Sequence, residues 1–399
     1  MKDKKSYFLI TVMLLVASSG ALTSVALIPA LAKISKSQEF SHLGNIQELV
    51  GMILGITGLF VAIGAPLVGL LSEHLKKTHI LLASMFLFSV AGSAGFYLDD
   101  IYLILISRAF VGLAVAGILT MNNTLIGDYF TGEARYRVMG LANGIGLGIN
   151  IFYAILAGIL LDISWRYNFL LFLLGFVLIV PILLAYREPK PAHKTNEEGN
   201  IKLDKKGNVF FILLTVLVAQ CMFYMPFVQL SFIFEKFNSN GSQIALALNI
   251  FLITAALGSA MYAFVRSKFH FKSIYGLIFV GMGACCIILG MSNTYNMALA
   301  AMFLGGFFFG WLSPNSSLWI MQLVPVAQRA RYMGVLASFW YMAVFLSPIT
   351  FSLLNQYKNN VHDTIALAGI ISTSLGVLFL MYSIFSKAPN KEQVNLEKI

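Results

Sequence analysis

One arginine offers the clearest chemistry in this sequence. Arg108 is the only charged side chain that we place well inside any of roughly a dozen apolar segments. A charge near the middle of a membrane helix costs about 2.5–3.5 kcal/mol on insertion scales, so such a residue usually faces protein or a water-filled path. A guanidinium there attracts an anion or lowers the pKa of a neighbouring acid, while Gly112, Ala116 and Gly117 let another helix approach closely. We expect Arg108 to contact a ligand that crosses the membrane; the alternative is an arginine that ties helix ends together.

Amide and aromatic side chains are the next candidates for chemistry. Asn150 and Gln220 lie deep in apolar segments, where an amide either contacts a solute or hydrogen-bonds to another helix. Aromatic residues gather around Pro226, around Pro314 and near position 340. Aromatic rings with scattered amides suit a moderately polar organic solute. The residues of these clusters that we single out for solute binding are Tyr224, Trp311, Asn315 and Trp340.

The 17 acidic residues all lie in loops or near the ends of apolar segments. Glu48, Asp128 and Glu235 come closest to the membrane. A carboxylate at membrane depth usually holds a cationic solute, and none is visible here, so a neutral or anionic solute is favoured. Glu48 is our candidate for a proton-binding group, and the alternative is a solvated helix cap.

The elements that position these residues are expected to be membrane helices. The chain of 399 residues is 58% hydrophobic and 11% charged, with a mean hydropathy of +0.81, whereas soluble domains carry about 25% charged residues. A span needs about 20 apolar residues. Twelve segments fit, near 6–32, 47–71, 79–97, 101–126, 138–161, 168–186, 209–231, 243–265, 273–290, 296–324, 332–354 and 364–386. The first could also be a signal peptide, but its apolar run is long for one and its loss would leave an odd number of spans.

The basic residues indicate the orientation of these spans. With the N-terminus in the cytoplasm, the opposite loops hold only five of the 27 Lys and Arg residues, and Arg108 lies in a span. The rest fall in cytoplasmic loops and tails, as the positive-inside rule requires. The net charge of +10 is therefore sorted by side and predicts a lipid bilayer, not a nucleic acid, as its partner. Both termini are expected in the cytoplasm, and the membrane is expected to be a prokaryotic-type inner membrane.

Metal and cofactor chemistry is not expected from this sequence. The three cysteines fall within spans, and the six histidines fall in loops or at helix ends without a ligand spacing. We predict no metal site and no cofactor.

The sequence divides into two similar halves. The longest polar stretch separates six spans from six, which predicts a six-helix bundle at 1–186, a cytoplasmic linker at 187–208 and a second bundle at 209–399. A shift of 194 residues aligns the two halves without a gap. The shift superimposes Gly64 on Gly258, Gly112 on Gly306, Arg135 on Arg329, Arg137 on Arg331, Met139 on Met333 and Gly140 on Gly334. An even number of spans between the copies gives both the same orientation, so we expect an all-α membrane protein of 12 helices in two parallel repeats.

Three motifs, taken with this repeat, resemble the major facilitator superfamily, and the resemblance covers essentially the whole chain. Gly-Leu-Leu-Ser-Glu-His-Leu-Lys-Lys at 69–77 is similar to the family's Gly-x-Leu-Ser/Ala-Asp-Arg-x-Gly-Arg-Arg loop between spans 2 and 3. The departures are Glu73 for Asp, His74 for Arg, Lys76 for Gly and Thr78 for the last basic residue. Arg108 and Gly112 match the Arg-x-x-x-Gly motif of span 4, and Trp165-Arg166 followed by Phe169 resembles the start of span 6 in drug-exporter-like members.

The resemblance implies a cytoplasmic latch between the two halves. In the family, an acidic residue and a basic cluster of this loop hold the halves together when the transporter faces outward, and an acid is stabilised by a helix N-terminus or a nearby guanidinium. Glu73 would take that part here; the alternative is a solvated turn. The residues of the expected latch are Gly69, Glu73, Lys76, Lys77, Asp128, Arg135, Arg137, Arg329 and Arg331.

The resemblance also implies a function. Spans 1, 4, 7 and 10 would line a central cavity, and the pattern is similar to the drug- and metabolite-efflux branch. We therefore expect a secondary transporter, a monomer, that exports a small organic solute by alternating access with proton coupling. The alternative is uptake or exchange of an anionic metabolite or a siderophore with Arg108 as the anion ligand. Span 5 carries Tyr-Ala-Ile-Leu-Ala-Gly at 153–158 in place of the Gly-Pro-x-x-Gly-Gly of family antiporters, which weakens the antiport reading.

Proteins of other classes fit the sequence less well. A membrane enzyme would need clustered His, Asp or Cys at membrane depth, so we do not expect an enzyme. An ATP-driven pump would need a phosphate-binding Gly-x-x-x-x-Gly-Lys-Ser/Thr loop, which the sequence lacks. A channel would need no cytoplasmic latch.

Overall fold

The computed structural model describes residues 2–72, 74–130, 132–186, 206–324, 328–358 and 360–385, and this part of the chain is helical without strands. The first half contains α1 (Lys2–Val25), η1 (Ile28–Ala30), α2 (Leu31–Ser35), η2 (Gln38–Phe40), α3 (Ile46–Leu71), α4 (Lys77–Ser93), η3 (Ala94–Phe96), α5 (Ile101–Tyr129), α6 (Gly132–Ile163), η4 (Trp165–Leu173) and α7 (Leu174–Ala185). The second half contains α8 (Lys206–Val228), α9 (Leu230–Glu235), α10 (Gly241–Lys268), α11 (Phe271–Gly290), α12 (Tyr295–Phe309), α13 (Leu312–Leu323), α14 (Arg329–Lys358) and α15 (Val361–Phe385).

The predicted membrane helices are confirmed. Among the described residues, 11 helical stretches are long and apolar enough to cross a membrane, and α6 adds the shorter apolar stretch Gly148–Ile163. Several spans are interrupted where the sequence places proline or glycine. Pro29 lies in η1 between α1 and α2, and Gly310 separates α12 from α13. These breaks are tolerated in membrane helices when neighbouring groups bond the freed backbone.

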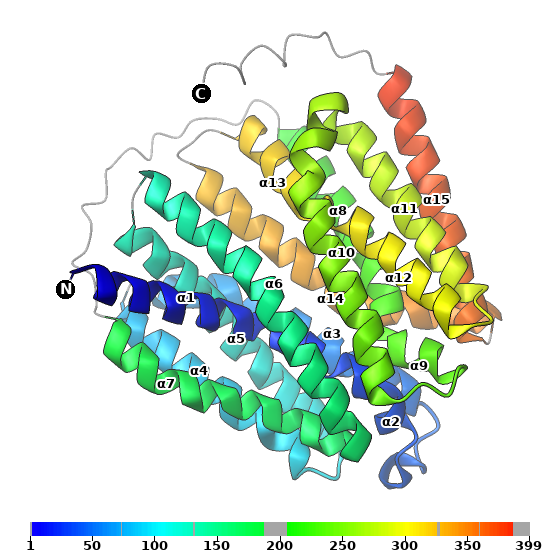
Figure 1. Ribbon diagram of the computed structural model, residues 1–399, viewed down its shortest axis with the longest axis horizontal. Helices are drawn as coiled ribbons and strands as arrows, with labels where there is room; N and C mark the ends of the chain where they lie inside the picture. The colour runs from blue at the N-terminus through cyan, green and yellow to red at the C-terminus, as the bar shows by residue number, and fades with distance from the viewer. Residues whose placement is uncertain are drawn as a thin grey trace.

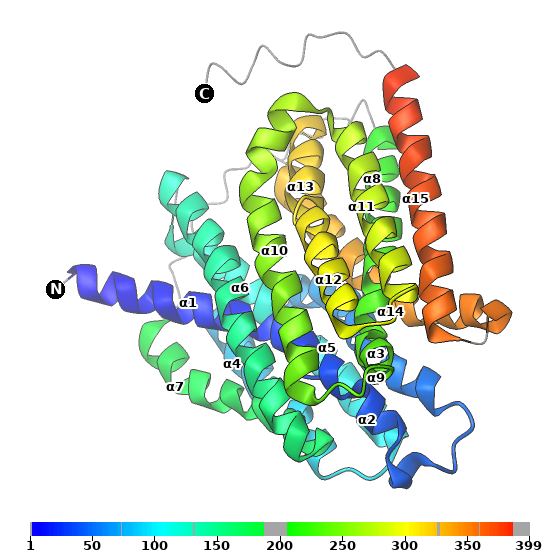
Figure 2. The same cartoon turned by 45° about the vertical axis from the view of Figure 1, so that its right-hand side comes forward.

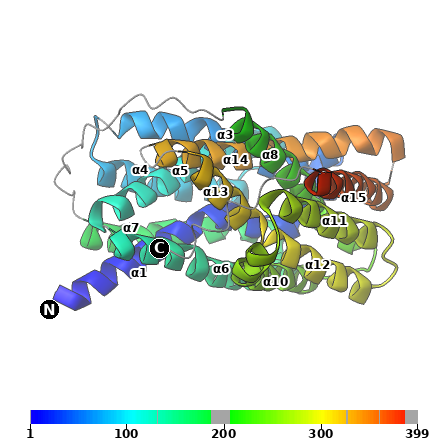
Figure 3. The ribbon, with the colours of Figure 1, turned by 90° about the horizontal axis from the view of Figure 1, so that it is seen from above.

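The two halves meet at one end of the molecule and diverge at the other. In Figure 1 the helices of the first half run from the left and those of the second half from the top, and the two sets converge at the lower right. Figure 2, turned by 45°, shows the same divergence, and Figure 3 shows the two halves side by side from above. We call the end where α1 begins and α15 ends the terminal face, and the end where α1 ends and α15 begins the distal face.

The internal repeat is confirmed by the packing of its glycines. Gly112 on α5 packs against the carbonyl of Thr57 on α3, and Gly306 on α12 packs against the carbonyl of Phe251 on α10. Both members of the second pair stand 194 residues after those of the first. A Cβ atom at either glycine would collide with the neighbouring backbone, so both sites need glycine for close helix approach. Each half is therefore built around the same tight crossing of its second and fourth spans.

Candidate functional site

Arg108 is packed inside the first half, between α5, α4 and η4. Its Nη2 atom donates to the carbonyl of Ala91 at 2.9 Å and to that of Gly92 at 2.7 Å, in the last turn of α4. The guanidinium carbon lies 5.0 Å from the ring centroid of Phe169 and 4.9 Å from that of Phe172, both in η4. The side chain is only 1% exposed. These hydrogen bonds and ring contacts of Arg108 are all made within the first half.

This environment is that of a cation at a helix C-terminus. The last carbonyls of an α-helix have no partner within the helix and carry a partial negative charge, which a guanidinium satisfies. The aromatic faces of η4 add a cation–π attraction. Nη1 of Arg108 is buried and has no hydrogen-bond partner. The arrangement fastens three spans of the first half and leaves one donor of the guanidinium unused.

Hydrogen bonds between the halves join α1 to α8 near the distal face. The hydroxyl of Ser24 on α1 lies 2.6 Å from that of Tyr224 on α8. Further along, Ser231 on α9 donates from its hydroxyl to the carbonyl of Ile28 at 2.6 Å. Ser231 is completely buried. The central helices of the two halves are therefore sealed against each other along these turns.

A second junction joins α6 to α10. The carboxylate of Asp162, in the last turn of α6, accepts the amide N–H of Gly241 at 2.7 Å and the hydroxyl of Ser242 at 2.8 Å. On the same side of α6, Lys33 donates from Nζ to the carbonyl of Leu161 at 2.8 Å. The start of α10 is thus held by a carboxylate from the other half.

A third junction joins α3 to α14. Gly51, Gly55 and Gly58 on α3 lie against α14, where a Cβ atom at Gly58 would be 2.7 Å from the carbonyl oxygen of Tyr341. Glu48 at the start of α3 accepts the hydroxyl of Ser352 on α14 at 2.6 Å.

The charged residues Lys36 and Glu235 add an ion pair between α9 and the residue that follows α2. We call these contacts and the three junctions together the distal seal. Hydrogen bonds and an ion pair of the described residues thus join the two halves along this seal.

The other residues selected from the sequence for solute binding are spread over the two halves. Asn150 on α6 is buried and its Oδ1 has no partner, and the indole nitrogens of Trp311 and Trp340 are buried without partners. Gln220 on α8 is half-buried. Asn315 is fully buried and its amide is engaged within the second half, since Oδ1 accepts the hydroxyl of Tyr262 at 3.0 Å and Nδ2 donates to the carbonyl of Phe271 at 3.2 Å.

The expected latch lies at the terminal face, and only part of it is described. Lys77 at the start of α4 forms an ion pair with Asp128 near the end of α5, with an N–O distance of 2.5 Å. Lys76 is exposed and precedes α4, and Gly69 lies in the last turns of α3. Glu73 lies outside the described residues, as do the side chains of Arg135, Arg137, Arg329 and Arg331.

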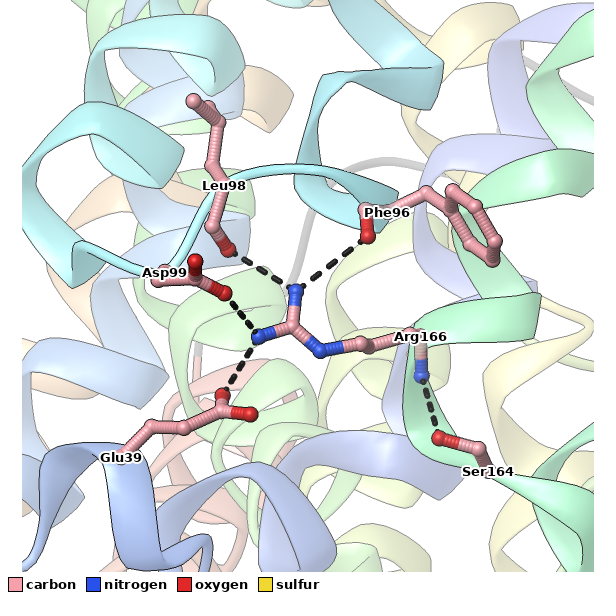
Figure 4. A network of polar contacts seen from close by, with 6 residues as sticks. All are labelled: Glu39, Phe96, Leu98, Asp99, Ser164 and Arg166. Atoms are coloured by element: carbon pink, nitrogen blue, oxygen red, sulfur yellow. Dashed lines mark hydrogen bonds and ion pairs between the residues drawn. The ribbon is translucent and has the colours of Figure 1, made fainter.

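Arg166, noted in the sequence only as part of a motif, organises the distal surface of the first half. Figure 4 shows its guanidinium between the carboxylates of Glu39 and Asp99, at 2.7 and 2.5 Å, and the carbonyls of Phe96 and Leu98, at 3.2 and 3.0 Å. The ring of Trp165 lies under the same guanidinium, with its centroid 4.6 Å away. The loops around η2 and η3 are thereby tied to the start of η4.

A cavity among the described residues lies within the first half, away from the distal seal. It has a volume of about 600 Å³ and lies between α1, α6 and α7. Its lining is apolar except for Tyr153, whose hydroxyl lies 3.3 Å from that of Ser18. The residues selected for solute binding do not line it.

Sequence reasoning selected Glu48 and Tyr224, which join the halves, but missed the other polar groups of these contacts. Ser24, Asp162, Ser231 and Ser352 were not selected, although each stands in or beside the last turns of a span. Serine at helical spacing near a span end is too common to identify a contact. The acid at the end of span 5, facing a helix start in the other repeat, is the one signal that a close reading could have used.

Comparison with known proteins agrees with this architecture. The family model described as Major Facilitator Superfamily matches residues 8–228 and 210–398. The tetracycline resistance protein, class H, of Pasteurella multocida is 22% identical over 370 residues, covering 88% of this chain and 89% of its own. The multidrug efflux pump SdrM of Staphylococcus aureus (strain N315) is 20% identical over 455 residues, covering 97% and 99%.

Solved structures show the same fold at low identity. A D-xylose-proton symporter superimposes with a TM-score of 0.76 at 15% identity, covering 96% of this chain and 99% of its own. A bacterial homologue of the human lysosomal transporter Spinster, in an inward-facing and occupied conformation, superimposes with a TM-score of 0.75 at 15% identity over 95% of both chains. The chain is a member of the Major Facilitator Superfamily and an integral membrane transporter.

Proposed function

We propose that this protein is a secondary transporter that exports a small organic solute from the cytoplasm by alternating access, coupled to the inward movement of protons. The observation that carries the proposal is the distal seal, in which hydrogen bonds of the described residues join the halves toward one face, while the helices diverge toward the other face (Figure 1). The distribution of Lys and Arg assigns the terminal face to the cytoplasm. We infer from these observations that the protein faces inward here, and we expect it to act as a monomer in the cytoplasmic membrane. The similarity to a multidrug efflux pump and to a tetracycline resistance protein supports export.

The solute site is proposed on the cytoplasmic side of the Ser24–Tyr224 bridge. Tyr224, Gln220, Trp340 and Asn150 supply hydroxyl, amide and indole groups there, and the described polar atoms of Asn150 and Trp340 that lack partners are available to a solute. A buried polar atom without a partner costs about 1–3 kcal/mol, so a solute that bonds it gains affinity. These groups are uncharged, which favours a neutral or weakly anionic organic molecule.

The proton site of this mechanism is proposed at Glu48. Its carboxylate belongs to the first half and bonds to Ser352 in the second half. Protonation would weaken this charge-assisted hydrogen bond, so proton binding and the contact between the halves are linked at this residue. The cytoplasmic latch of Glu73 with the basic residues around it is proposed to replace the distal seal when the protein faces outward.

A second function deserves a test because of the unused donor of Arg108. Nη1 of Arg108 is buried without a partner, which is the geometry that a carboxylate of an anionic metabolite or siderophore would satisfy in an importer or exchanger. The guanidinium is enclosed by α4 and η4 of its own half, so export of a solute bound elsewhere remains the first proposal.

The experiment is a flux assay in proteoliposomes that contain a pH-sensitive dye, with a panel of organic acids, neutral organic compounds and lipophilic cations. Export by antiport predicts that a solute applied at one side drives protons in the opposite direction, and that Glu48→Gln abolishes this movement. Co-movement of an acid with protons, lost in Arg108→Lys, would replace the proposal by the anion-uptake alternative. Cation-driven proton exchange would contradict the proposed neutral or anionic solute.

A further inference from the structure

We propose that the junction of α6 and α10 is a releasable latch at the distal face, separate from the cytoplasmic latch around Glu73. The carboxylate of Asp162 binds the start of α10 and must dissociate from it before the protein opens at the distal face. The inference rests on the proposed function, because it takes the structure as one of two alternating states. It gives a gating role to a residue outside the solute and proton sites described above.

The first backbone donors of α10 are divided between side-chain amides of its own half and a carboxylate of the other half. Asn240, the residue before the helix, accepts the amide N–H of Gln243 at 2.8 Å, and the side chain of Gln243 accepts the N–H of Asn240 at 3.0 Å. The N–H groups of Gly241 and Ser242 are left by this capping box, and Asp162 accepts them at 2.7 and 3.4 Å. The helix therefore keeps its own cap when the halves separate and loses only the carboxylate of the other half.

An anion at this position is stabilised by the partial positive charge of the helix start, in addition to its hydrogen bonds. The hydroxyl of Ser242 adds a third donor to the same carboxylate. Among the described contacts between the halves, this one gathers the most hydrogen bonds on one side chain.

The backbones of α6 and α10 must approach closely for the carboxylate to reach. A Cβ atom at Gly241 would lie 2.6 Å from the carbonyl oxygen of Gly158, and one at Gly158 would lie 2.9 Å from the carbonyl oxygen of Gly241. Both distances are too short for a carbon atom beside a carbonyl, so the crossing needs glycine on both helices. The two glycines allow the helices to touch, and Asp162 forms the hydrogen bonds that hold them together.

The solvent exposure of the Asp162 side chain suits a contact that breaks once in each transport cycle. Asp162 is exposed at the edge of the molecule, so water replaces the N–H donors when the carboxylate withdraws, and the donors of Gly241 and Ser242 are hydrated in turn. Lys33, from the same half as Asp162, bonds the neighbouring carbonyl of Leu161 and stays with it. The latch is therefore stable while closed and carries no buried unpaired charge when open.

The test is the rate of thiol labelling at a position that only distal opening exposes. Val228 is 1% exposed and lies beside Gly51 of the other half, so Val228→Cys reports separation of the halves without the loss of a hydrogen bond. The protein is held in lipid nanodiscs, where a hydrophilic maleimide reaches both faces, on a background in which the three native cysteines are replaced. Adding Asp162→Asn removes the negative charge and points an amide donor at the donors of Ser242. We expect labelling to become about tenfold faster, which corresponds to a shift of about 1.4 kcal/mol in the opening equilibrium.

The matched control is Asp99→Asn. Asp99 is also an aspartate on the distal surface, but its carboxylate bonds Arg166 within the first half (Figure 4), so its neutralisation leaves the labelling rate unchanged if the latch is specific. Ser242→Ala, which removes one hydrogen bond and keeps the charge, should accelerate labelling by about twofold to threefold. It serves as a second variant if Asp162→Asn does not fold.

Unchanged labelling in Asp162→Asn, or unchanged labelling in Ser242→Ala if the first variant cannot be purified, overturns the latch. Equal acceleration by Asp99→Asn also overturns it, because the effect would then belong to surface charge in general. The readout needs no solute. If labelling becomes faster but the parent protein shows no solute-driven proton movement, the Asp162 latch is supported and the proposed function is rejected. If the parent protein transports normally but labelling is unchanged, the proposed function is supported and the Asp162 latch is rejected.

Discussion

The role of Arg108 can be decided by its contribution to stability. The change is Arg108→Ala, which removes two hydrogen bonds to the carbonyls of Ala91 and Gly92 and two ring contacts. Hydrogen bonds to a charged group contribute about 1.5–3 kcal/mol each, and a cation–π contact about 0.5–1 kcal/mol. Burial of the guanidinium, which is 1% exposed, offsets several kcal/mol of this gain. The substitution also leaves the two carbonyls without this partner, at about 1–3 kcal/mol each, so we expect a loss of about 2–6 kcal/mol.

The assay is unfolding of the purified protein by titration with SDS in mixed micelles, followed by the fluorescence of its four tryptophans. Arg108→Lys keeps the charge but not the planar fork, so it should recover about half of the loss. Arg108→Met restores most of the side-chain volume without a donor and separates the packing contribution from that of the hydrogen bonds. If Arg108→Ala unfolds within about 1 kcal/mol of the parent, the fastening role derived from the geometry is refuted. A stable Arg108→Ala protein that has lost transport would instead identify the arginine as a ligand or coupling group.

Three further changes test the seal and the proposed site. Gly58→Ala places a Cβ atom 2.7 Å from the carbonyl oxygen of Tyr341, so the distal seal cannot close fully. Maleimide labelling of the Val228→Cys reporter should become at least about threefold faster. An unchanged labelling rate would exclude a tight crossing of α3 and α14 at this position. Tyr224→Phe removes the hydroxyl bond to Ser24, measured at 2.6 Å, and should lower the rate of solute export by about threefold to tenfold in proteoliposomes, in line with the loss of one neutral hydrogen bond; full export would remove the bridge from the transport cycle. Glu48→Gln should abolish solute-driven proton movement while leaving solute binding measurable by calorimetry, and normal proton movement would exclude Glu48 as the proton site.

Much of the fold could be predicted because its signals are local or periodic. Hydropathy alone located the spans, since a helix must be apolar over about 20 residues wherever it lies in the bundle. The shift of 194 residues was readable because Gly112 and Gly306 occupy equivalent crossings in the two halves. The 3₁₀ geometry of η4 at the start of the sixth span was not anticipated, since apolar sequence does not distinguish it from the α-helix that follows.

The contacts of the candidate site could not be predicted in the same way. The surroundings of Arg108 depend on where α4 ends in space, and the hydropathy of α5 contains no information about that. Asp162 has its partners 79 and 80 residues later in another half, so its sequence context is that of an ordinary solvated helix end. In both cases the sequence shows which chemical groups are present, and the packing of distant segments determines what they bond.

The network around Arg166 makes the distal surface of the first half suitable as a handle for structure determination. Loops between membrane helices often move independently, but here Glu39 of η2, Asp99 before α5 and the carbonyls of the η3 turn all bond one guanidinium (Figure 4). A nanobody raised against this surface would bind three segments that move together. The nanobody would therefore keep the same position on the first half in both transport states. Its position relative to the second half in electron micrographs would then measure the rotation between the two halves.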